Sequence, residues 1–402
     1  MPQPDTIIDE LRAVLAEDET LTDRLERSLV SAGERARADL DGTLYAALEW
    51  PEDLERYEAY LGRFIRWIPQ QSGAEAWREQ APEERYAQEV SDRLAHFFWL
   101  VDQDVDGEGT AIGQNSDRFR GWLTDFARQW GSFLDTPESF SQEILQSFLD
   151  NAPEYTIEES LVEGTPNTPS GWLTFNQFFA RELNAGLRPI AEPGSNLVIT
   201  SPADCSYRHT FDIDDQSGIP GITLKNTHSF AGVGQLLQGS EHADAFAGGT
   251  FVHFMLPPSS YHRYHLPVSG TVRESYLVSG KSYLQSVIQD GQLESLDSAE
   301  TGYEFTQNRG VVVLDTAGPD GPGIGLVAVV PVGMAHVSSV TLTTVVGEHA
   351  AKGEEFGFFQ FGGSDIIILL QAGARARVDT AEGIRKVGTP VATCSPLDAG
   401  TS

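Results

Sequence analysis

The stretch FGGSDIIILL, residues 361–370, says most about this chain, because it joins a glycine pair and a serine to an uninterrupted apolar run. The apolar part, residues 366–370, is typical of a buried strand. Gly362 and Gly363 permit backbone angles that other residues hold only at a cost, so they can present the next peptide bond in a strained geometry. Two interpretations stay open on these residues alone. They form a glycine turn that leads into a strand, or the Ser364 hydroxyl attacks the peptide bond that precedes it.

The composition indicates a folded chain with two or three domains. Its 402 residues are 40% hydrophobic and 21% charged, and no apolar stretch is long enough for a membrane helix. The first 19 residues include six acids, which is unlike a signal peptide. We therefore expect a cytoplasmic protein without stable membrane insertion.

The net charge of −32 is unusual and limits the classes of partner. The chain has 59 acids against 27 Lys and Arg, and the first of its four lysines is Lys225. Such a surface repels nucleic acid and anionic membranes, so we expect neither as a partner.

The first part of the chain has the apolar spacing of amphipathic helices, from residue 5 to about residue 160. Apolar side chains recur three and four positions apart in three runs, and residues 135–139 read as a helix stop followed by a new cap. The aromatic residues among them are expected to form a core. The apolar positions are Ile7, Ile8, Leu11, Leu15, Leu21, Leu25 and Leu29; Tyr86, Val90, Leu94, Phe97, Phe98 and Leu100; and Phe119, Trp122, Leu123, Phe126, Trp130 and Phe133.

From about residue 195 the pattern changes to short β-branched runs between glycine and proline turns. The loop at residues 164–170 is rich in Pro, Thr and Gly and marks the boundary between the two parts. We predict an α+β chain with a helical N-terminal domain, residues 1–165, and a β-rich domain, residues 166–402. The clearest predicted strands are 197–200, 310–314, 326–330 and 337–346.

Two features of the sequence, an acidic loop and a pair of cysteines, bear on metal or thiol chemistry. Residues 102–107 match the start of a calcium-binding loop, but the twelfth position, which should be a glutamate, is Gly113. We therefore interpret these residues as an acidic, solvated loop. The two cysteines, Cys205 and Cys394, are too few for a disulfide framework or a metal quartet, and we expect them to be inert.

Two further segments carry residues with possible chemistry. Asp204 follows a proline-set turn just after a predicted strand, and His262 and His265 stand three positions apart before Pro267. Together with Ser364 they can supply a hydroxyl nucleophile, its base and an acid that orients the base. Chain order alone is weak evidence, because such triads occur in several unrelated orders.

Each candidate also has a structural interpretation. Asp204 can cap a turn with its side chain. On a regular strand His262 and His265 would point to opposite faces, so a bulge or turn is needed to bring them together. They lack a third ligand at a recognisable spacing, and we expect no metal site. The remaining candidates, which we expect to be structural or exposed, are His228, His253 and His336.

Taken together, these segments resemble the phosphatidylserine decarboxylase family of pyruvoyl enzymes. The resemblance covers some 200 residues with five motifs in the correct order. A second resemblance links residues 122–139 to the extra N-terminal domain of a soluble subgroup that includes a fungal tryptophan decarboxylase. The five motifs are FFAREL with RPI (178–190), SPAD (201–204), HRYHLP (262–267), KGEE (352–355) and GGS (362–364).

The resemblance implies a role for each candidate residue. Ser364 matches the serine that cleaves the chain between Gly363 and Ser364 and becomes the pyruvoyl cofactor. His265 matches the base for that cleavage, Asp204 the acid that orients the base, and His262 a histidine of the decarboxylation step. Cleavage would give a large chain, residues 1–363, and a small chain that begins with the pyruvoyl group. Association of two copies into a homodimer is left open.

The resemblance also implies the reaction, in which a pyruvoyl-dependent lyase releases carbon dioxide from its substrate. The acidic helical part lacks the basic amphipathic surface that would attract it to anionic lipid. We therefore expect a free L-amino acid as substrate, with an aromatic one such as tryptophan favoured by resemblance. Phosphatidylserine is the enzymatic alternative.

Three positions depart from the family pattern. Ser260 stands where the family usually has Asp, Cys205 where it has Gly, and Asp365 where it has Thr or Ser. Asp365 matters most, because its carboxylate either affects the adjacent cleavage or lies on the outward face without effect. These departures motivate another alternative, an uncleaved relative that acts as a binding protein.

Overall fold

The chain forms two compact units, each described here by itself. Unit 1 comprises residues 1–157, 172–178 and 281–297, and unit 2 comprises residues 158–171, 179–280 and 298–402. The computed structural model describes residues 4–77, 88–107, 116–168, 171–223, 230–280, 286–295, 302–318, 323–333, 339–361 and 364–397. The α+β fold class is confirmed, while the predicted domain boundary at residue 165 stays a prediction.

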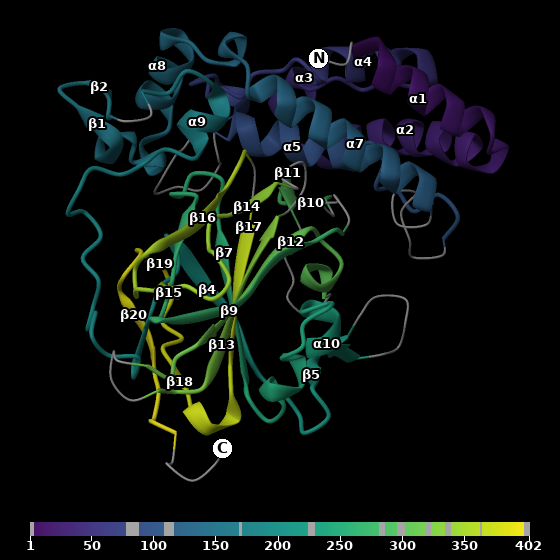
Figure 1. Cartoon of the computed structure of the whole chain (residues 1–402). Helices are drawn as coiled ribbons and strands as arrows, with labels where there is room; N and C mark the ends of the chain where they lie inside the picture. The colour runs from purple at the N-terminus through teal and green to yellow at the C-terminus, as the bar shows by residue number, and fades with distance from the viewer. Residues whose placement is uncertain are drawn as a thin grey trace. The chain divides into compact units, whose positions relative to one another are not determined.

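Unit 1 is built mainly from helices, as the apolar spacing predicts (Figure 1). Several begin at a polar cap whose side chain accepts a backbone N–H, such as Asp18 before α2 and Ser116 before α7. Helix α7 ends at Leu134, where the sequence predicts a stop. Its elements are α1 (Pro4–Ala16), α2 (Glu19–Asp39), α3 (Gly42–Ala47), α4 (Leu54–Phe64), α5 (Glu89–Trp99), α7 (Asp117–Leu134), α8 (Gln142–Asn151) and the hairpin β10 (Ser286–Gln289) and β11 (Gln292–Ser295).

Among the described residues, the predicted apolar positions of unit 1 form its core, except Phe133, which is half-buried. Phe64, Phe97, Phe126 and Trp130 pack with ring centroids between 4.7 and 6.3 Å apart and are almost completely buried. These aromatic residues are therefore core residues, as expected. Tyr86, in the second predicted run, lies outside the described residues.

Unit 2 is organised around an antiparallel eight-stranded sheet, in which β17 lies between β13 and β7 (Figure 1). The predicted runs at 310–314, 326–330 and 366–370 fall within strands, and the run at 197–200 does so except for its first residue. In spatial order the sheet contains β15 (His349–Ala350), β9 (Gly270–Val278), β12 (Arg309–Asp315), β13 (Leu326–Gly333), β17 (Ser364–Leu370), β7 (Thr250–Leu256), β4 (Cys205–Asp212) and β19 (Ile384–Arg385).

Smaller elements complete unit 2. The predicted strand at 337–346 is shorter than expected: β14 spans Val340–Leu342, and residues 337 and 338 lie outside the described part. These elements are the sheets β14–β16–β8, with β16 (Glu355–Phe359) and β8 (Arg263–His265), and β18–β20–β3, with β18 (Arg377–Val378), β20 (Pro390–Thr393) and β3 (Val198–Thr200); the pairs β5 (Gly218–Thr223) with β6 (Phe230–Gly232) and β1 (Leu161–Val162) with β2 (Thr165–Pro166); and the short helix α10 (Val233–Leu236). Helix α9 (Phe175–Phe179) contributes only its last residue to unit 2.

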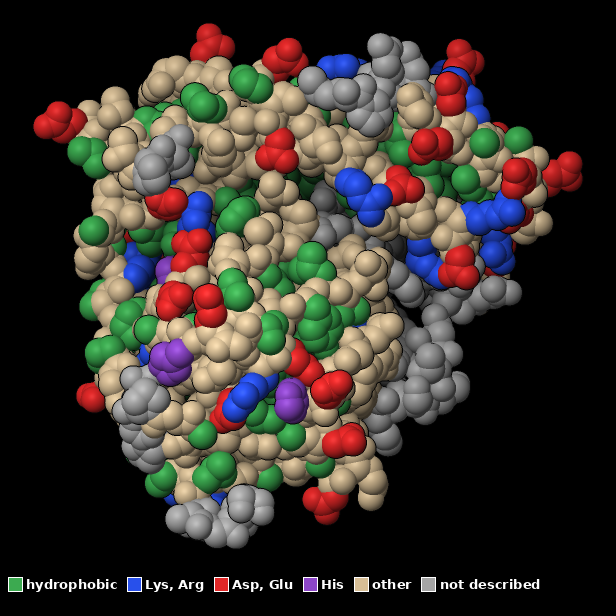
Figure 2. Space-filling model, in the orientation of Figure 1, with side chains coloured by type: hydrophobic (Ala, Val, Ile, Leu, Met, Phe, Trp, Pro, Cys, Tyr) green, Lys and Arg blue, Asp and Glu red, His purple; other side chains and the backbone are tan. Residues whose placement is uncertain are grey.

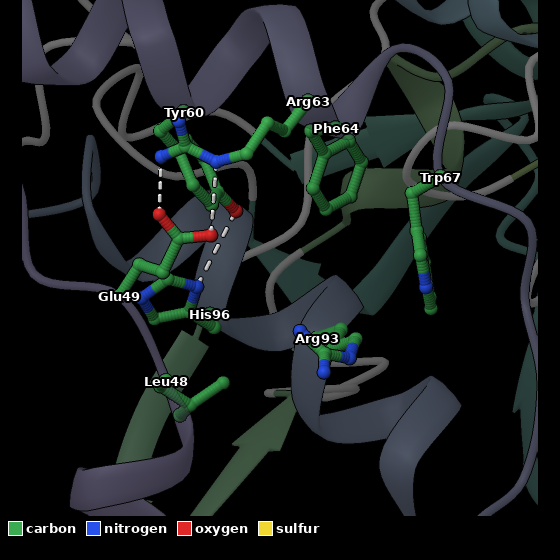
Figure 3. A pocket seen from close by; sticks show the side chains of 8 residues that line it. All are labelled: Leu48, Glu49, Tyr60, Arg63, Phe64, Trp67, Arg93 and His96. Atoms are coloured by element: carbon green, nitrogen blue, oxygen red, sulfur yellow. Dashed lines mark hydrogen bonds and ion pairs between the residues drawn. The ribbon is translucent and has the colours of Figure 1, made fainter.

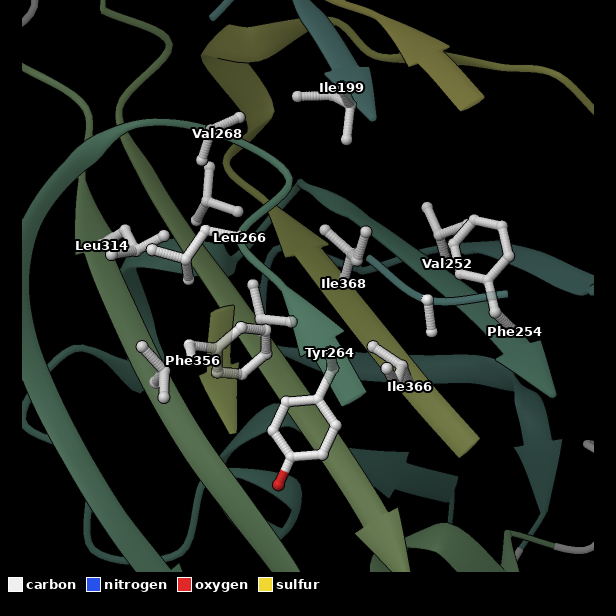
Figure 4. Close-up of a cluster of buried hydrophobic side chains, with 14 of the residues drawn as sticks. Ile199, Val252, Phe254, Tyr264, Leu266, Val268, Leu314, Phe356, Ile366 and Ile368 are labelled. Carbon is white, nitrogen blue, oxygen red and sulfur yellow. The ribbon is translucent and has the colours of Figure 1, made fainter. Parts of the chain in front are cut away.

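Both faces of the large sheet are covered. On one face Ile366 and Ile368 of β17 join a cluster with Phe254 of β7 and Tyr264 of β8 (Figure 4). On the other face Ile367 and Leu369 join a second cluster, which also contains residues of α10. Coverage on both faces explains why residues 366–370 are an unbroken apolar run and not an alternating one.

Within the described residues, no helix is both long and apolar enough to cross a membrane.

Candidate active site

Ser364 is the first residue of β17 and is 1% exposed. Its backbone pairs with Gly333 of β13 and Leu256 of β7, so the start of the strand is held from both sides. The Ser364 Oγ lies 3.4 Å from Nδ1 of His262, 102 positions away in the sequence. Gly362 and Gly363, and with them the predicted cleavage bond, lie outside the described residues.

His262 stands just before β8 and is fully buried. Its Nε2 lies 3.1 Å from the carbonyl oxygen of Pro258. A carbonyl only accepts hydrogen bonds, so Nε2 carries the hydrogen and Nδ1 offers its lone pair to the Ser364 hydroxyl. The ring stacks on Phe179 at a centroid distance of 4.0 Å. Burial lowers the pKa of His262 to about 3, so this imidazole is neutral near pH 7.

His265 is the last residue of β8 and faces different partners. Its Nδ1 lies 2.9 Å from the carbonyl oxygen of Gly353, and its Nε2 lies 3.1 Å from the hydroxyl of Tyr261. The carbonyl requires a hydrogen on Nδ1, which leaves Nε2 to accept from Tyr261. Burial lowers the pKa of His265, against the opposing effects of the Gly353 carbonyl and the charges of Glu355 and Asp204.

The carboxylate of Asp204 is held by Arg188. Arg188 donates from Nε to Oδ1 at 3.0 Å and from Nη2 to Oδ2 at 2.5 Å, and the Val387 N–H donates to Oδ1 at 2.8 Å. Arg188 also binds Glu159 at 2.6 Å. Burial lowers the pKa of Arg188, but the hydrogen bonds to Asp204 and Glu159 outweigh it and raise that pKa above its ordinary value. Asp204 is thus part of a buried ion-pair network and not a simple turn cap.

Of the four predicted site residues, the structure brings Ser364 and His262 into contact. Among the described residues, the side-chain hydrogen bonds of His265 go to Tyr261 and Gly353, and those of Asp204 go to Arg188 and Val387. Asp204 still acts on His265 through its charge. His262 lies just before β8 and His265 is its last residue, and the side-chain hydrogen bonds of the two histidines go to different partners.

Asp365 does not lie on the outward face, so that alternative is wrong. Its side chain is completely buried and accepts a hydrogen bond of 2.5 Å from the Tyr303 hydroxyl. Alternation along β17 places Asp365 on the face opposite Ser364, beside His253. The predicted structural role of His253 agrees with its complete burial, whereas His228 and His336 lie outside the described residues.

Several residues near the site were missed by sequence reasoning. Phe179, Tyr261 and Arg188 contact His262, His265 and Asp204 respectively. Arg188 and Phe179 occur within segments that carry the family resemblance, which is the only sequence signal for them. Lys352, in another of these segments, donates to three backbone carbonyls, and burial lowers its pKa to about 8.

Neither the acidic loop at residues 102–107 nor Cys205 forms a metal or thiol site among the described residues. Asp106 of the acidic loop pairs with Arg24 and Arg27, and Asp102 accepts from the Ser286 N–H, so these carboxylates have protein partners. No cluster of metal-ligating side chains occurs among the described residues. Burial raises the pKa of the Cys205 thiol to about 12, which keeps it protonated.

Unit 1 contains a pocket of about 140 Å³ between α4 and α5 (Figure 3). The aromatic side chains Tyr60, Phe64 and Trp67 line it together with His96. Its charged residues have partners in the chain, with Arg63 bound to Glu49 and Arg93 to Glu89. None of the predicted site residues lines this pocket.

Comparison with known proteins agrees with the resemblance. The sequence profile of the family "Phosphatidylserine decarboxylase" matches residues 175–392. A phosphatidylserine decarboxylase proenzyme 2 of Oryza sativa subsp. japonica is 32% identical over 254 residues, which cover 63% of this chain and 37% of the rice protein. A decarboxylase of Amanita muscaria, iboD, is 29% identical over 264 residues (60% of this chain, 73% of the relative). A phosphatidylserine decarboxylase proenzyme of Clostridium novyi is 29% identical over 251 residues (61% and 74%).

Proposed function

Because the chain belongs to the phosphatidylserine decarboxylase family, we propose that it is a self-processing, pyruvoyl-dependent decarboxylase of a free L-amino acid. An aromatic amino acid such as tryptophan is the first candidate substrate. The observation that carries the proposal is the position of Ser364, buried at the start of β17 with its Oγ 3.4 Å from His262. The match with a relative named a decarboxylase without reference to a lipid, iboD, supports a substrate other than phospholipid.

Self-cleavage begins when the Ser364 Oγ attacks the carbonyl carbon of Gly363. The bond from that carbon to the Ser364 nitrogen breaks, the nitrogen takes a proton, and an ester remains. A base then removes the α-hydrogen of residue 364 while the bond from Cβ to the ester oxygen breaks, which leaves Gly363 with a free carboxylate. Water then adds at the α-carbon of residue 364 and the nitrogen leaves as ammonia, so that the small chain begins with a pyruvoyl group.

We assign the base of this cleavage to His265 and not to His262. A base works best when its pKa lies near the working pH, and a pKa of about 3 makes His262 a weak one. The charges of Asp204 and Glu355 oppose the lowering of the His265 pKa. His265 must leave Tyr261 to reach Ser364, and the Arg188 clamp holds the Asp204 side chain in place while it does so.

The surroundings of residue 364 suit a pyruvoyl group. The group supplies an electron sink for the decarboxylation. His262 offers Nδ1 within 3.4 Å of the Ser364 Oγ, and Phe179 fixes the imidazole plane by stacking. The complete burial of this histidine excludes bulk water from its vicinity. We therefore assign His262 to the decarboxylation step, in which its Nδ1 faces residue 364.

The two chains stay together after cleavage in this proposal. Three strands of the small chain pair with strands of the large chain. Strand β17 pairs with β13 and β7, β19 pairs with β4, and β20 pairs with β3. These pairings are independent of the bond between residues 363 and 364. Cytoplasmic location and assembly into a homodimer belong to the same proposal.

The charge of the molecule supports an amino acid over a phospholipid substrate. The chain has 32 more acids than Lys and Arg, and Figure 2 shows acidic side chains scattered over one face. Such a surface is repelled by a bilayer of anionic lipid, in which phosphatidylserine would have to be reached. Phosphatidylserine remains the competing substrate that an assay must include.

Intact mass spectrometry of the purified chain tests the proposal. We expect two chains that meet between residues 363 and 364, with the small chain lighter by one ammonia than a simple hydrolysis product. The cleaved protein is then assayed with L-tryptophan and with phosphatidylserine vesicles. Turnover of the lipid alone would overturn the substrate, and a single uncleaved chain would favour the binding-protein alternative.

A further inference from the structure

Asp365 is a charged residue type in a strand that is otherwise apolar after its first residue. The next five residues of β17, 366–370, are aliphatic and buried. Asp365 is equally buried, at 0% exposure, and its backbone pairs with Val332 of β13 and Met255 of β7. A carboxylate in such a place costs free energy unless hydrogen-bonding partners meet it.

The polar contacts of Asp365 come from two different elements of unit 2, a hydrogen bond from Tyr303 and a longer approach by His253. Tyr303, in the 3-10 turn at residues 303–305, donates its hydroxyl to Oδ2 of Asp365 at 2.5 Å. His253 of β7 places its Nε2 3.4 Å from Oδ1 and is itself fully buried. The rings of His253 and Tyr303 lie 6.3 Å apart, so both flank the same carboxylate.

The apolar run by itself specifies the pairing register of β17 poorly. Residues 366–370 are all Ile or Leu, so a slip by two positions replaces one aliphatic residue with another on the same face. A slip by one position would move Ser364 to the opposite face, away from His262. Either slip would take Asp365 away from Tyr303 and His253 and bury its carboxylate without them.

We propose that Asp365, held by Tyr303 and His253, is a positioning residue that fixes the register of β17 and thereby places Ser364 for self-cleavage. The inference rests on the proposed self-cleavage of this chain. Asp365 touches none of the reacting atoms, because its side chain lies on the other face of the sheet. It acts through the backbone: once the second residue of the strand is fixed, the first can present its hydroxyl only toward His262.

The test compares Asp365→Leu with Asp365→Asn, with intact mass spectrometry following cleavage over time. Leu suits the apolar surroundings but cannot accept a hydrogen bond from Tyr303 or contact His253 through a carboxylate. We therefore expect a folded protein that cleaves about 10- to 100-fold more slowly. Asn keeps an oxygen that accepts from Tyr303, and we expect it to restore most of the rate. Tyr303→Phe, which removes the donor, should slow cleavage in the same direction as Leu.

Ile367→Val is the matched control, since Ile367 lies on the same face one pair further along β17. We expect wild-type cleavage from it. Thermal unfolding of every variant separates loss of stability from loss of positioning. A Leu variant that cleaves within twofold of the wild type overturns the inference, and so does equal slowing by the Leu variant and the control. A wild-type chain that never cleaves refutes the proposed function itself.

Discussion

Burial lowers the pKa of two histidines in different units of this protein, and their partners differ. His96 in α5 of unit 1 and His262 in unit 2 are both buried, and burial lowers each pKa to about 3. Each also places Nδ1 near a hydroxyl, at 3.3 Å from Tyr60 and at 3.4 Å from Ser364 respectively. Burial and a shifted pKa therefore do not distinguish a catalytic histidine from a structural one.

The difference lies in the hydroxyl that each histidine meets. Tyr60 is a core residue of α4, packed against Phe64 and Phe97. Ser364 begins a central strand directly after two glycines, and in the proposed cleavage its hydroxyl attacks the peptide bond before it. A neutral imidazole becomes useful only where a nucleophile and an attackable bond are present.

Removal of the two hydroxyls should produce the largest contrast. Ser364→Ala deletes the nucleophile, and we expect no cleavage at all over several days on a denaturing gel. Tyr60→Phe deletes the corresponding hydroxyl beside His96 and should cleave at the wild-type rate. Cleavage of the Ser364→Ala chain at the same bond would show that another group attacks it.

Replacement of each histidine should affect the rate of decarboxylation differently. We expect His262→Ala to cleave but to lose about 10²- to 10⁴-fold in amine formation, the range typical of a lost acid or base. His96→Ala should retain the activity of each folded molecule. The rate of amine formation by each variant is divided by its fraction of cleaved chain. An equal loss of this rate in both variants would contradict a special role of His262.

The division of work between His262 and His265 can be tested in the same way. We expect His265→Ala to slow self-cleavage at least about 10²-fold, because it removes the better base. Asp204→Asn, which weakens the charge beside His265 and the clamp to Arg188, should slow it less. Normal cleavage by His265→Ala together with none by His262→Ala would assign the base to His262.

The smallest effect concerns stability in acid, in which the two histidines should act alike. Each has an ordinary pKa of about 6.5 when unfolded and about 3 when folded, so the unfolded chain takes up the proton first as the pH falls. Each should therefore lower the unfolding free energy by about 1.4 kcal/mol per pH unit below pH 6.5. At pH values above 6.5 both states are neutral and this effect is absent.

His96→Gln should make that acid slope shallower by about 1.4 kcal/mol per pH unit, measured by urea unfolding between pH 6.5 and 5. The wild type at each pH is the control, since Gln does not titrate. Buried acids such as Glu154, whose pKa burial raises to about 7, contribute a slope of opposite sign. The difference between the two proteins removes that contribution. An unchanged slope would mean that His96 is already protonated in the folded chain.

Much of the architecture follows from local patterns in the sequence. The three-and-four spacing predicts the helices of unit 1, and the polar caps Asp18 and Ser116 begin two of them. The β-branched runs predict the central strands of unit 2. These patterns are informative because they report which face of one element is buried, which its own residues decide.

The site is less accessible to such reasoning. The sequence supplied Ser364, His262, His265 and Asp204 as candidates but not their contacts. Arg188 precedes β3 and Asp204 follows it. The hydrogen bonds between them depend on how these two segments meet in the fold, which no local pattern reports. No local pattern reports the hydrogen-bond partner of Asp365 either, because Tyr303 stands 62 positions away.

The sequence by itself determined the elements, the family and the residue types available for chemistry, because spacing and motifs are properties of neighbouring residues. The tertiary structure alone decided that Ser364 meets His262 and that Asp365 faces the other way. Those contacts join strands and turns between 62 and 102 positions apart. They exist because the apolar face of each strand has to be buried against another, and that packing fixes which side each polar residue occupies.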